Sequence, residues 1–135
     1  MNVRPKIKQL TTRYQEGEND CGAAAVAMLC GTTYKRAAEL VFKDRDAGRT
    51  ASGRLLAAIR HFGGMPLTDR CVARGKVDLT ELKNDALLKC QMLNGDKSYT
   101  HWAVWDCEGQ TIRDPYGYWH PLKVTHLAEI AWPEC

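Results

Sequence analysis

The chain has 135 residues, of which 44% are hydrophobic, and this size and composition predict one domain, residues 1–135, built around one core. The net charge of +3 comes from 19 basic and 16 acidic residues spread along the chain, which argues against a nucleic-acid-binding protein. No apolar run is long enough to span a membrane, and the basic residues near the start are not followed by the apolar stretch of a secretory signal. A cytoplasmic protein is therefore expected.

Three helices are expected in the N-terminal half. The Ala-rich stretch 21–30 follows two N-cap candidates, Asn19 and Asp20, and is apolar on nearly all sides, which indicates a buried helix. A second helix is expected from residue 34 to about residue 43, after a threonine pair that can cap it. A third is expected over 52–62, where apolar residues recur at helical spacing before a glycine pair.

Antiparallel strands are expected in the C-terminal half. Asn94-Gly95 is a strong hairpin signal, although the polar residues that follow it can lengthen the loop. Strands are expected over 100–107 and 110–114, around Glu108-Gly109, and a last short helix is expected to begin at Thr125. Helices first and strands afterwards predict an α+β domain.

The cysteines and histidines do not form the pattern of a metal site. No Cys-x-x-Cys pair occurs among the six cysteines, and none of the four histidines lies at zinc-ligand spacing from them. Without an export signal, reduced thiols explain the cysteines better than a disulfide framework does. The sequence predicts neither a metal nor a cofactor.

Cys21 stands where a polar loop meets the first expected helix. At the start of a helix, free N–H groups and the positive end of the dipole stabilise a thiolate, which is the reactive form of cysteine. A free cysteine is also commonly a small buried apolar residue, so the two interpretations of Cys21 stay open on its context alone.

His101 and Asp114 are expected to meet on one face of the sheet. If the turn at Glu108-Gly109 is a loop of two or four residues, Asp114 lies opposite Ala103, which shares a face with His101. The two would then be diagonal neighbours roughly 7–8 Å apart, within reach of a side-chain hydrogen bond. An imidazole that takes the thiol proton, oriented by a carboxylate, is the arrangement needed for nucleophilic catalysis. Taken singly, His101 can be a packed strand residue and Asp114 part of a plain turn.

Gln15 lies six residues before Cys21. Its amide and the Cys21 backbone N–H could together donate to the oxyanion of an acyl transfer, although a loop glutamine is ordinarily just solvated.

These residues fall in three stretches: Gln15-x-x-x-x-Asp20-Cys21-Gly22-x-Ala24, His101-Trp102-Ala-Val104 and Asp114-Pro115. Over about residues 10 to 133, their order and spacing resemble the bacteriocin-processing cysteine peptidases, a branch of the papain-like superfamily. The resemblance implies a papain-like fold, in which an N-terminal helical half with a buried nucleophile helix packs on a C-terminal antiparallel sheet. It implies Cys21 as nucleophile, His101 as general base and then acid, Asp114 as orienting residue and Gln15 as oxyanion donor.

The resemblance also implies a peptide or protein substrate, cut after small residues such as Gly-Gly. Relatives that mature bacteriocins usually belong to ATP-driven exporters, whereas this chain has no nucleotide-binding loop. Residues 65–83, where such domains help to form the substrate groove, depart most from the family. A thiol amidase, deamidase or transglutaminase-like enzyme with the same triad remains an alternative, as does a non-catalytic peptide-binding module of the same fold.

Overall fold

The structure, a computed structural model, describes residues 5, 7, 21–42, 51–94, 97–115 and 122–133. Its three α-helices are α1 (Cys21–Cys30), α2 (Tyr34–Val41) and α3 (Ser52–His61). They confirm the three expected helices, with α2 ending slightly before the expected residue 43. The N-cap candidates Asn19 and Asp20 lie outside the described residues.

Local sequence explains where α2 begins and where α3 ends. Thr33 caps α2, because its hydroxyl accepts a hydrogen bond of 3.2 Å from the backbone N–H of Arg36. After α3, Gly63 adopts a φ of 98°, which side-chain-bearing residues rarely adopt, and the N–H of Gly64 donates to the carbonyl of Ile59 at 3.0 Å. This pattern is a Schellman motif, so the glycine pair ends the helix as expected.

The strands form one antiparallel sheet of six strands. Their bounds are β1 (Met65–Pro66), β2 (Val72–Ala73), β3 (Asp85–Asn94), β4 (Lys97–Asp106), β5 (Thr111–Arg113) and β6 (Leu122–Ala131). The order across the sheet is β1-β6-β3-β4-β5, and β2 also pairs with β6. Helices followed by an antiparallel sheet confirm the α+β class. No helix within the described ranges has the length and apolar character needed to cross a membrane.

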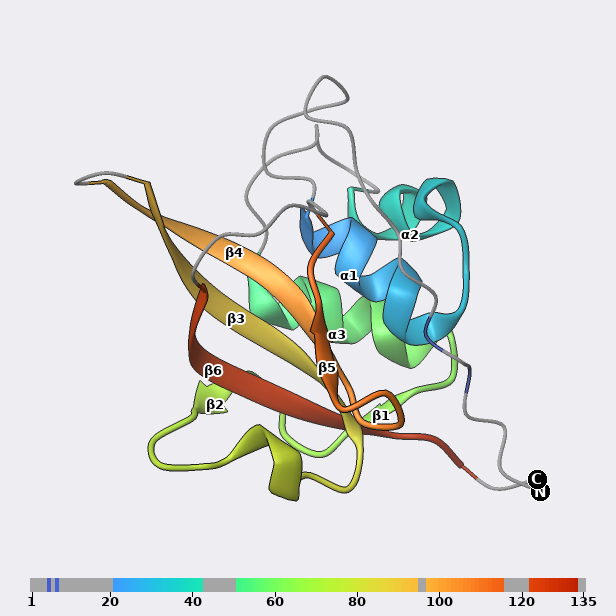
Figure 1. Cartoon of the computed structure of the whole chain (residues 1–135). Coiled ribbons are helices and arrows are strands. Elements are labelled where there is room, and N and C mark those ends of the chain that lie inside the picture. The colour runs from blue at the N-terminus through green and yellow to red at the C-terminus, as the bar shows by residue number, and fades with distance from the viewer. Residues whose placement is uncertain are drawn as a thin grey trace.

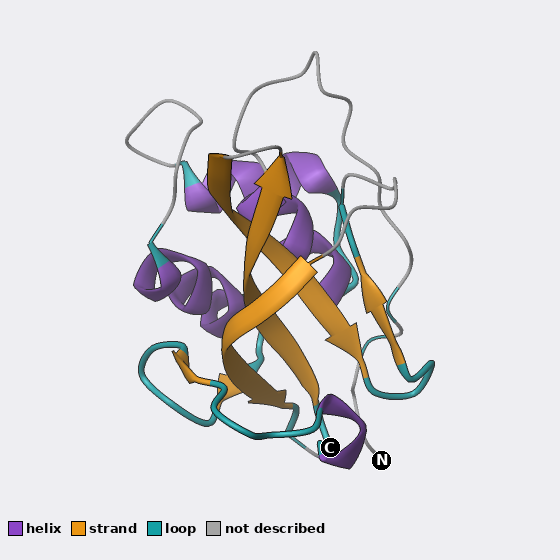
Figure 2. Cartoon of the chain, turned by 60° about the vertical axis from the view of Figure 1, so that its left-hand side comes forward, coloured by secondary structure: helices purple, strands orange, loops and turns teal. Residues whose placement is uncertain are grey.

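The helices cover one face of the sheet, as Figures 1 and 2 show from two sides. Side chains alternate along β4, so Trp102 and Val104 join the apolar cluster that contains the helices, whereas Ala103 and Trp105 join a second cluster on the opposite face. We call these clusters the helix-side core and the far-side core. A 3₁₀ helix, η2 (Leu79–Glu81), contributes Leu79 to the far-side core.

The β3–β4 hairpin is confirmed, and its loop is short. Asn94 pairs with Lys97, so only two residues separate the paired ends of β3 and β4. These two residues lie outside the described ranges. The polar residues from Lys97 onward belong to β4 and do not lengthen the loop.

The helix expected from Thr125 is wrong, because these residues belong to β6. The pairing of β6 with β3 shifts by one residue, since Lys89 pairs with His126 but Cys90 pairs with Val124, and this shift leaves Thr125 as a β-bulge. The bulge puts Val124 on the same face of the sheet as Leu127, three residues later, and both are buried in the far-side core. Three-residue spacing of buried residues imitates a helix, which is why the sequence pattern is misleading here.

Candidate active site

Cys21 is the first residue of α1 and is only 3% exposed. The first N–H groups of a helix have no acceptor within it and point toward any negative charge that forms at this end. Gly22 allows the helix to start close to the sheet, because a Cβ at this position would lie 3.3 Å from Trp102 Cδ1 and 3.1 Å from Leu55 Cδ2. Cys21 is therefore held beside β4, next to the residue that follows His101.

His101 is almost completely buried, at 1% exposure, and contacts both of its expected partners. Its Nε2 lies 2.7 Å from Oδ1 of Asp114, and its side chain also lies close enough to Cys21 for the two groups to interact electrostatically. With Nε2 engaged by Asp114, Nδ1 is the ring nitrogen that can exchange a proton with the thiol. Cys21, His101 and Asp114 are thus assembled in one place from α1, β4 and the end of β5.

The register of β4 and β5 brings Asp114 to His101. Val104 pairs with Arg113 and Asp106 with Thr111, and the four residues 107–110 form the turn between the strands. Continued by one residue, this register sets Asp114 opposite Ala103 and diagonal to His101. The expected register and the expected hydrogen bond are both confirmed, whereas the catalytic roles of these residues stay predictions.

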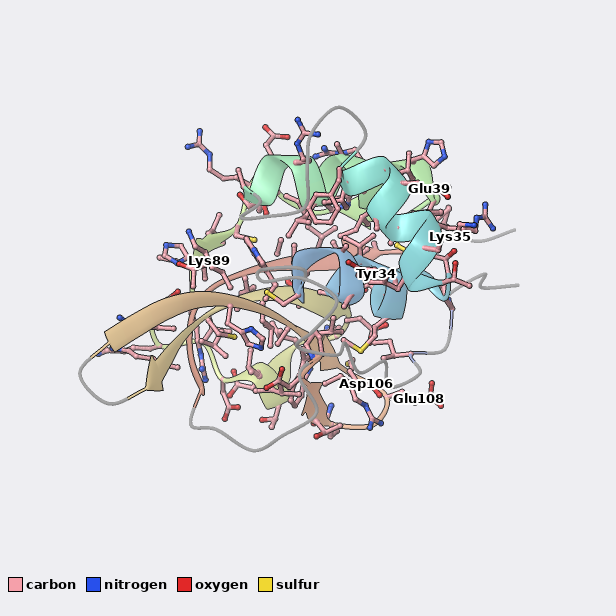
Figure 3. The ribbon with its side chains drawn as sticks, turned by 90° about the horizontal axis from the view of Figure 1, so that it is seen from above. Tyr34, Lys35, Glu39, Lys89, Asp106 and Glu108 are labelled. Carbon is pink, nitrogen blue, oxygen red and sulfur yellow. The ribbon has the colours of Figure 1, made fainter. Side chains whose placement is uncertain are left out.

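A second carboxylate fixes this hairpin. Asp106, which is 6% exposed, accepts hydrogen bonds of 3.2 Å from both Nε and an Nη of Arg113 and one of 3.0 Å from the backbone N–H of Gly109. Arg113 directly precedes Asp114 on the chain. Figure 3 labels Asp106 beside the turn that it stabilises. The Asp106–Arg113 pair therefore holds the register on which the position of Asp114 depends.

The surroundings of His101 favour its protonated form. Burial lowers the pKa of His101, but its hydrogen bond to Asp114 and its interaction with the Cys21 thiol, together with the negative charges of these two groups, raise it from 6.5 to about 9. At neutral pH the ring is therefore an imidazolium that lies between the carboxylate of Asp114 and the sulfur of Cys21. An imidazolium beside a cysteine is the arrangement that stabilises a thiolate.

A second thiol faces His101 from β3. Cys90 pairs directly with His101 across the two strands and is 2% exposed. Burial raises the pKa of Cys90 to about 12, and the negative charges of Asp114 and Cys21 add to this effect, while Arg74 opposes it. Cys90 is therefore a neutral thiol at pH 7 and is not equipped to act as a nucleophile.

Sequence reasoning missed Cys90, Asp106 and Arg113 as neighbours of the site. The signal for Cys90 was present, because a two-residue loop after Asn94 sets Cys90 opposite His101. Gln15, the expected oxyanion donor, lies outside the described residues.

The other histidines and possible metal ligands do not join this site in the described part of the chain. His61 is exposed on α3 and His126 is half-buried on β6, while His120 lies outside the described ranges. Within those ranges no group of three or more His, Cys, Asp and Glu side chains could hold a metal ion. The five described cysteines are free thiols.

Comparisons of the chain with protein-family models, with curated proteins and with solved structures found no match. The geometry of the site therefore has to support any function by itself.

Proposed function

We propose that the chain is a cysteine peptidase of the papain-like superfamily that hydrolyses a peptide bond through Cys21, His101 and Asp114. One observation carries the proposal: a buried histidine contacts a carboxylate at 2.7 Å and also a cysteine at the start of a helix. Neither contact alone suggests catalysis, but together they supply a nucleophile, a proton carrier and a group that orients the carrier.

The first half of the proposed reaction forms an acyl-enzyme. The Cys21 thiolate attacks the carbonyl carbon of the peptide, and a carbon–sulfur bond forms while the carbonyl oxygen takes up the negative charge. The backbone N–H of Cys21 is available to this oxyanion, because an N–H in the first turn of a helix has no intrahelical acceptor. The carbon–nitrogen bond then breaks, and the leaving amine takes the proton of the His101 imidazolium.

The second half releases the product. Neutral His101 takes a proton from water as the water oxygen attacks the thioester carbon, and the carbon–sulfur bond breaks to return the Cys21 thiolate beside an imidazolium. Asp114 holds the ring through Nε2 in both halves, so that Nδ1 faces the reacting atoms throughout. Gln15 is the proposed second donor to the oxyanion, as the family resemblance implies.

The arrangement of the chain supports the papain-like assignment. The candidate nucleophile starts a buried helix that packs against the sheet bearing the histidine, and helices precede strands along the chain. The proposed partner is accordingly a peptide or protein substrate, and cleavage after small residues is part of the same proposal.

A library of peptides of defined sequence tests this function. We expect the wild-type protein to cleave a subset of the library and Cys21→Ala to cleave none, with the products read by mass spectrometry. A brief incubation of a cleaved peptide should also give a covalent adduct of the acyl portion on Cys21, visible in the intact mass. Deamidated peptides without chain cleavage would assign the chain to the amidases, and no reaction with any peptide would contradict the proposal.

A further inference from the structure

One lysine lies on the helix-facing side of the sheet without an acidic partner. Lys89 pairs across β3 and β4 with Trp102 and across β3 and β6 with His126, so the three side chains share one face. Lys89 is half-buried, and no ion pair joins its ammonium to an acid of the described chain. Lysines that leave the solvent are ordinarily paired, so this charge calls for an anion that the described chain does not supply.

Lys89 is connected to the start of α1 through a single side chain. Trp102, its direct neighbour on β4, packs against Gly22, the residue after Cys21. Cys71 belongs to the same helix-side core as Cys21. Burial raises the pKa of Cys71 to about 11, and the positive charge of Lys89 opposes this effect, so the charge of Lys89 acts within that core.

The neighbours of Lys89 leave its charge uncompensated. The hydroxyl of Thr125 donates to the Lys89 backbone carbonyl at 3.2 Å and lies 3.0 Å from Nδ1 of His126, so the bulge of β6 fixes the backbone here and orients a ring without bringing a carboxylate. Asp114, the carboxylate that contacts His101 in the candidate site, is already engaged there.

We propose that Lys89 forms a subsite for a carboxylate of the substrate, and that the enzyme prefers peptides with an Asp or Glu side chain within about two residues of the bond that it cleaves. The inference rests on the proposed function and assigns its substrate class. Each residue of an extended peptide spans at most about 3.3–3.6 Å, so a carboxylate side chain one or two residues from the bond at Cys21 would extend past Trp102 to reach Lys89 on the helix-facing side of the sheet. Complementary charge at such a position selects among peptides that the catalytic groups treat alike.

Two alkylating agents test the subsite without requiring hydrolysis. Iodoacetate and iodoacetamide carry the same reactive carbon, but only iodoacetate is an anion. The rate of Cys21 alkylation by each is measured at low ionic strength by peptide mapping, and the ratio of the two rates reports the electrostatic potential at the thiol. The imidazolium of His101 contributes to this ratio equally in the wild type and in variants at position 89.

We expect Lys89→Met to lower the iodoacetate-to-iodoacetamide ratio roughly threefold and Lys89→Glu to lower it roughly tenfold, because each change removes one or two units of positive charge near the thiol. Added salt should shrink both effects. Lys35→Met is the matched control, since Lys35 lies on α2 at the far end of the molecule from Lys89, as Figure 3 shows, and its ratio should equal that of the wild type.

The outcomes separate this inference from the proposed function. An unchanged ratio in both Lys89 variants, with Cys21 still alkylated rapidly by iodoacetamide, would overturn the subsite and leave the nucleophile in place. Failure of Cys21 to react with either agent would overturn the proposed nucleophile and the subsite with it. The iodoacetamide rate also shows whether each variant keeps the site intact.

Discussion

Two buried thiols flank His101, and their surroundings differ in what they offer to a negative charge. Cys21 is the first residue of a helix, where the backbone N–H groups of the first turn have no acceptor within the helix, and its thiol interacts with the imidazole of His101. Cys90 lies in the middle of β3, directly across from the same histidine, where burial and the charges of Asp114 and Cys21 raise its pKa to about 12. Cys21 and Cys90 therefore both lie next to His101.

The different surroundings of these two thiols show that a neighbouring histidine alone does not make a cysteine a nucleophile. The backbone of a strand has its N–H groups committed to the ladder and offers none to a thiolate, whereas the first turn of a helix has them free. The element that carries the cysteine therefore decides its chemistry. Each of the following predictions tests a part of this contrast.

The largest expected effect is in thiol reactivity. With limiting iodoacetamide at pH 7, Cys21 should be alkylated at least about 100 times faster than Cys90, because a thiol with a pKa of about 12 has only about 10⁻⁵ of its population as thiolate. His101→Ala should slow the reaction of Cys21 and leave that of Cys90 unchanged. Time-resolved peptide mapping gives both rates, and equal rates in the wild type would remove the distinction between the two thiols.

The next effect concerns the carboxylate. Asp114→Asn should lower kcat/KM about 10²-fold, because the ring loses the charge that orients it and stabilises its protonated form. In the wild type, activity should fall as the pH rises through about 9, where His101 loses the proton that the leaving amine needs. The variant should lose activity at a lower pH, since the Asp114 contact is one of the causes that raise the pKa of His101. An unshifted alkaline limb in the pH profile would exclude Asp114 from this role.

The raised pKa of His101 also sets the sign of a stability effect. A histidine whose pKa is higher in the folded than in the unfolded chain contributes its full stabilisation below its ordinary value of 6.5, and this stabilisation is lost as the pH rises through about 9. Urea denaturation at pH 6 and pH 10 should therefore show a larger decrease in the free energy of unfolding for the wild type than for Asp114→Asn.

The parts of this site that could be predicted from the sequence are those set by local features. The composition of residues 21–30 gives a buried helix with Cys21 at its start, and the short turn after Asp106 sets the register that joins His101 to Asp114. Both depend on residues close together in the chain, where loop length and periodicity act directly.

The parts that could not be predicted depend on distant pairing. Lys89 meets His126 only because β6 returns beside β3, and the bulge at Thr125 that sets their register has no sequence signal of its own. The same bulge makes β6 look helical. Cys90 is an intermediate case, since the hairpin at Asn94 implies its pairing with His101, but its inertness follows from burial in the folded chain.

A smaller effect is expected from the pair that holds the β4–β5 turn. Asp106→Ala should lower kcat/KM about tenfold, because Arg113 and Gly109 lose their common acceptor and Asp114 is held less firmly against His101. NMR titration should show the pKa of His101 falling from about 9 toward its ordinary value of 6.5. Asp69→Ala, which removes an exposed carboxylate elsewhere, is the matched control.

The partner residue sharpens this test. Arg113→Ala should reproduce the effect of Asp106→Ala, and the double variant should be little worse than either, because both changes remove one interaction. Additive losses, or a His101 pKa that stays near 9 in both variants, would mean that the pair stabilises the turn without positioning Asp114.

The smallest effect on activity is expected at the second thiol. Cys90→Ala should leave kcat/KM within about twofold of the wild type, because a neutral thiol takes no part in proton transfer, while the free energy of unfolding falls by about 1 kcal/mol for the lost packing. Cys90→Ser should cost more, about 2 kcal/mol, because it buries a hydroxyl in an apolar cluster. Urea denaturation and steady-state kinetics on both variants separate the two quantities. If either variant kept its stability but lost most of its activity, Cys90 would take part in catalysis. The contrast with Cys21 would then fail, because a thiol in the middle of a strand would not be unreactive.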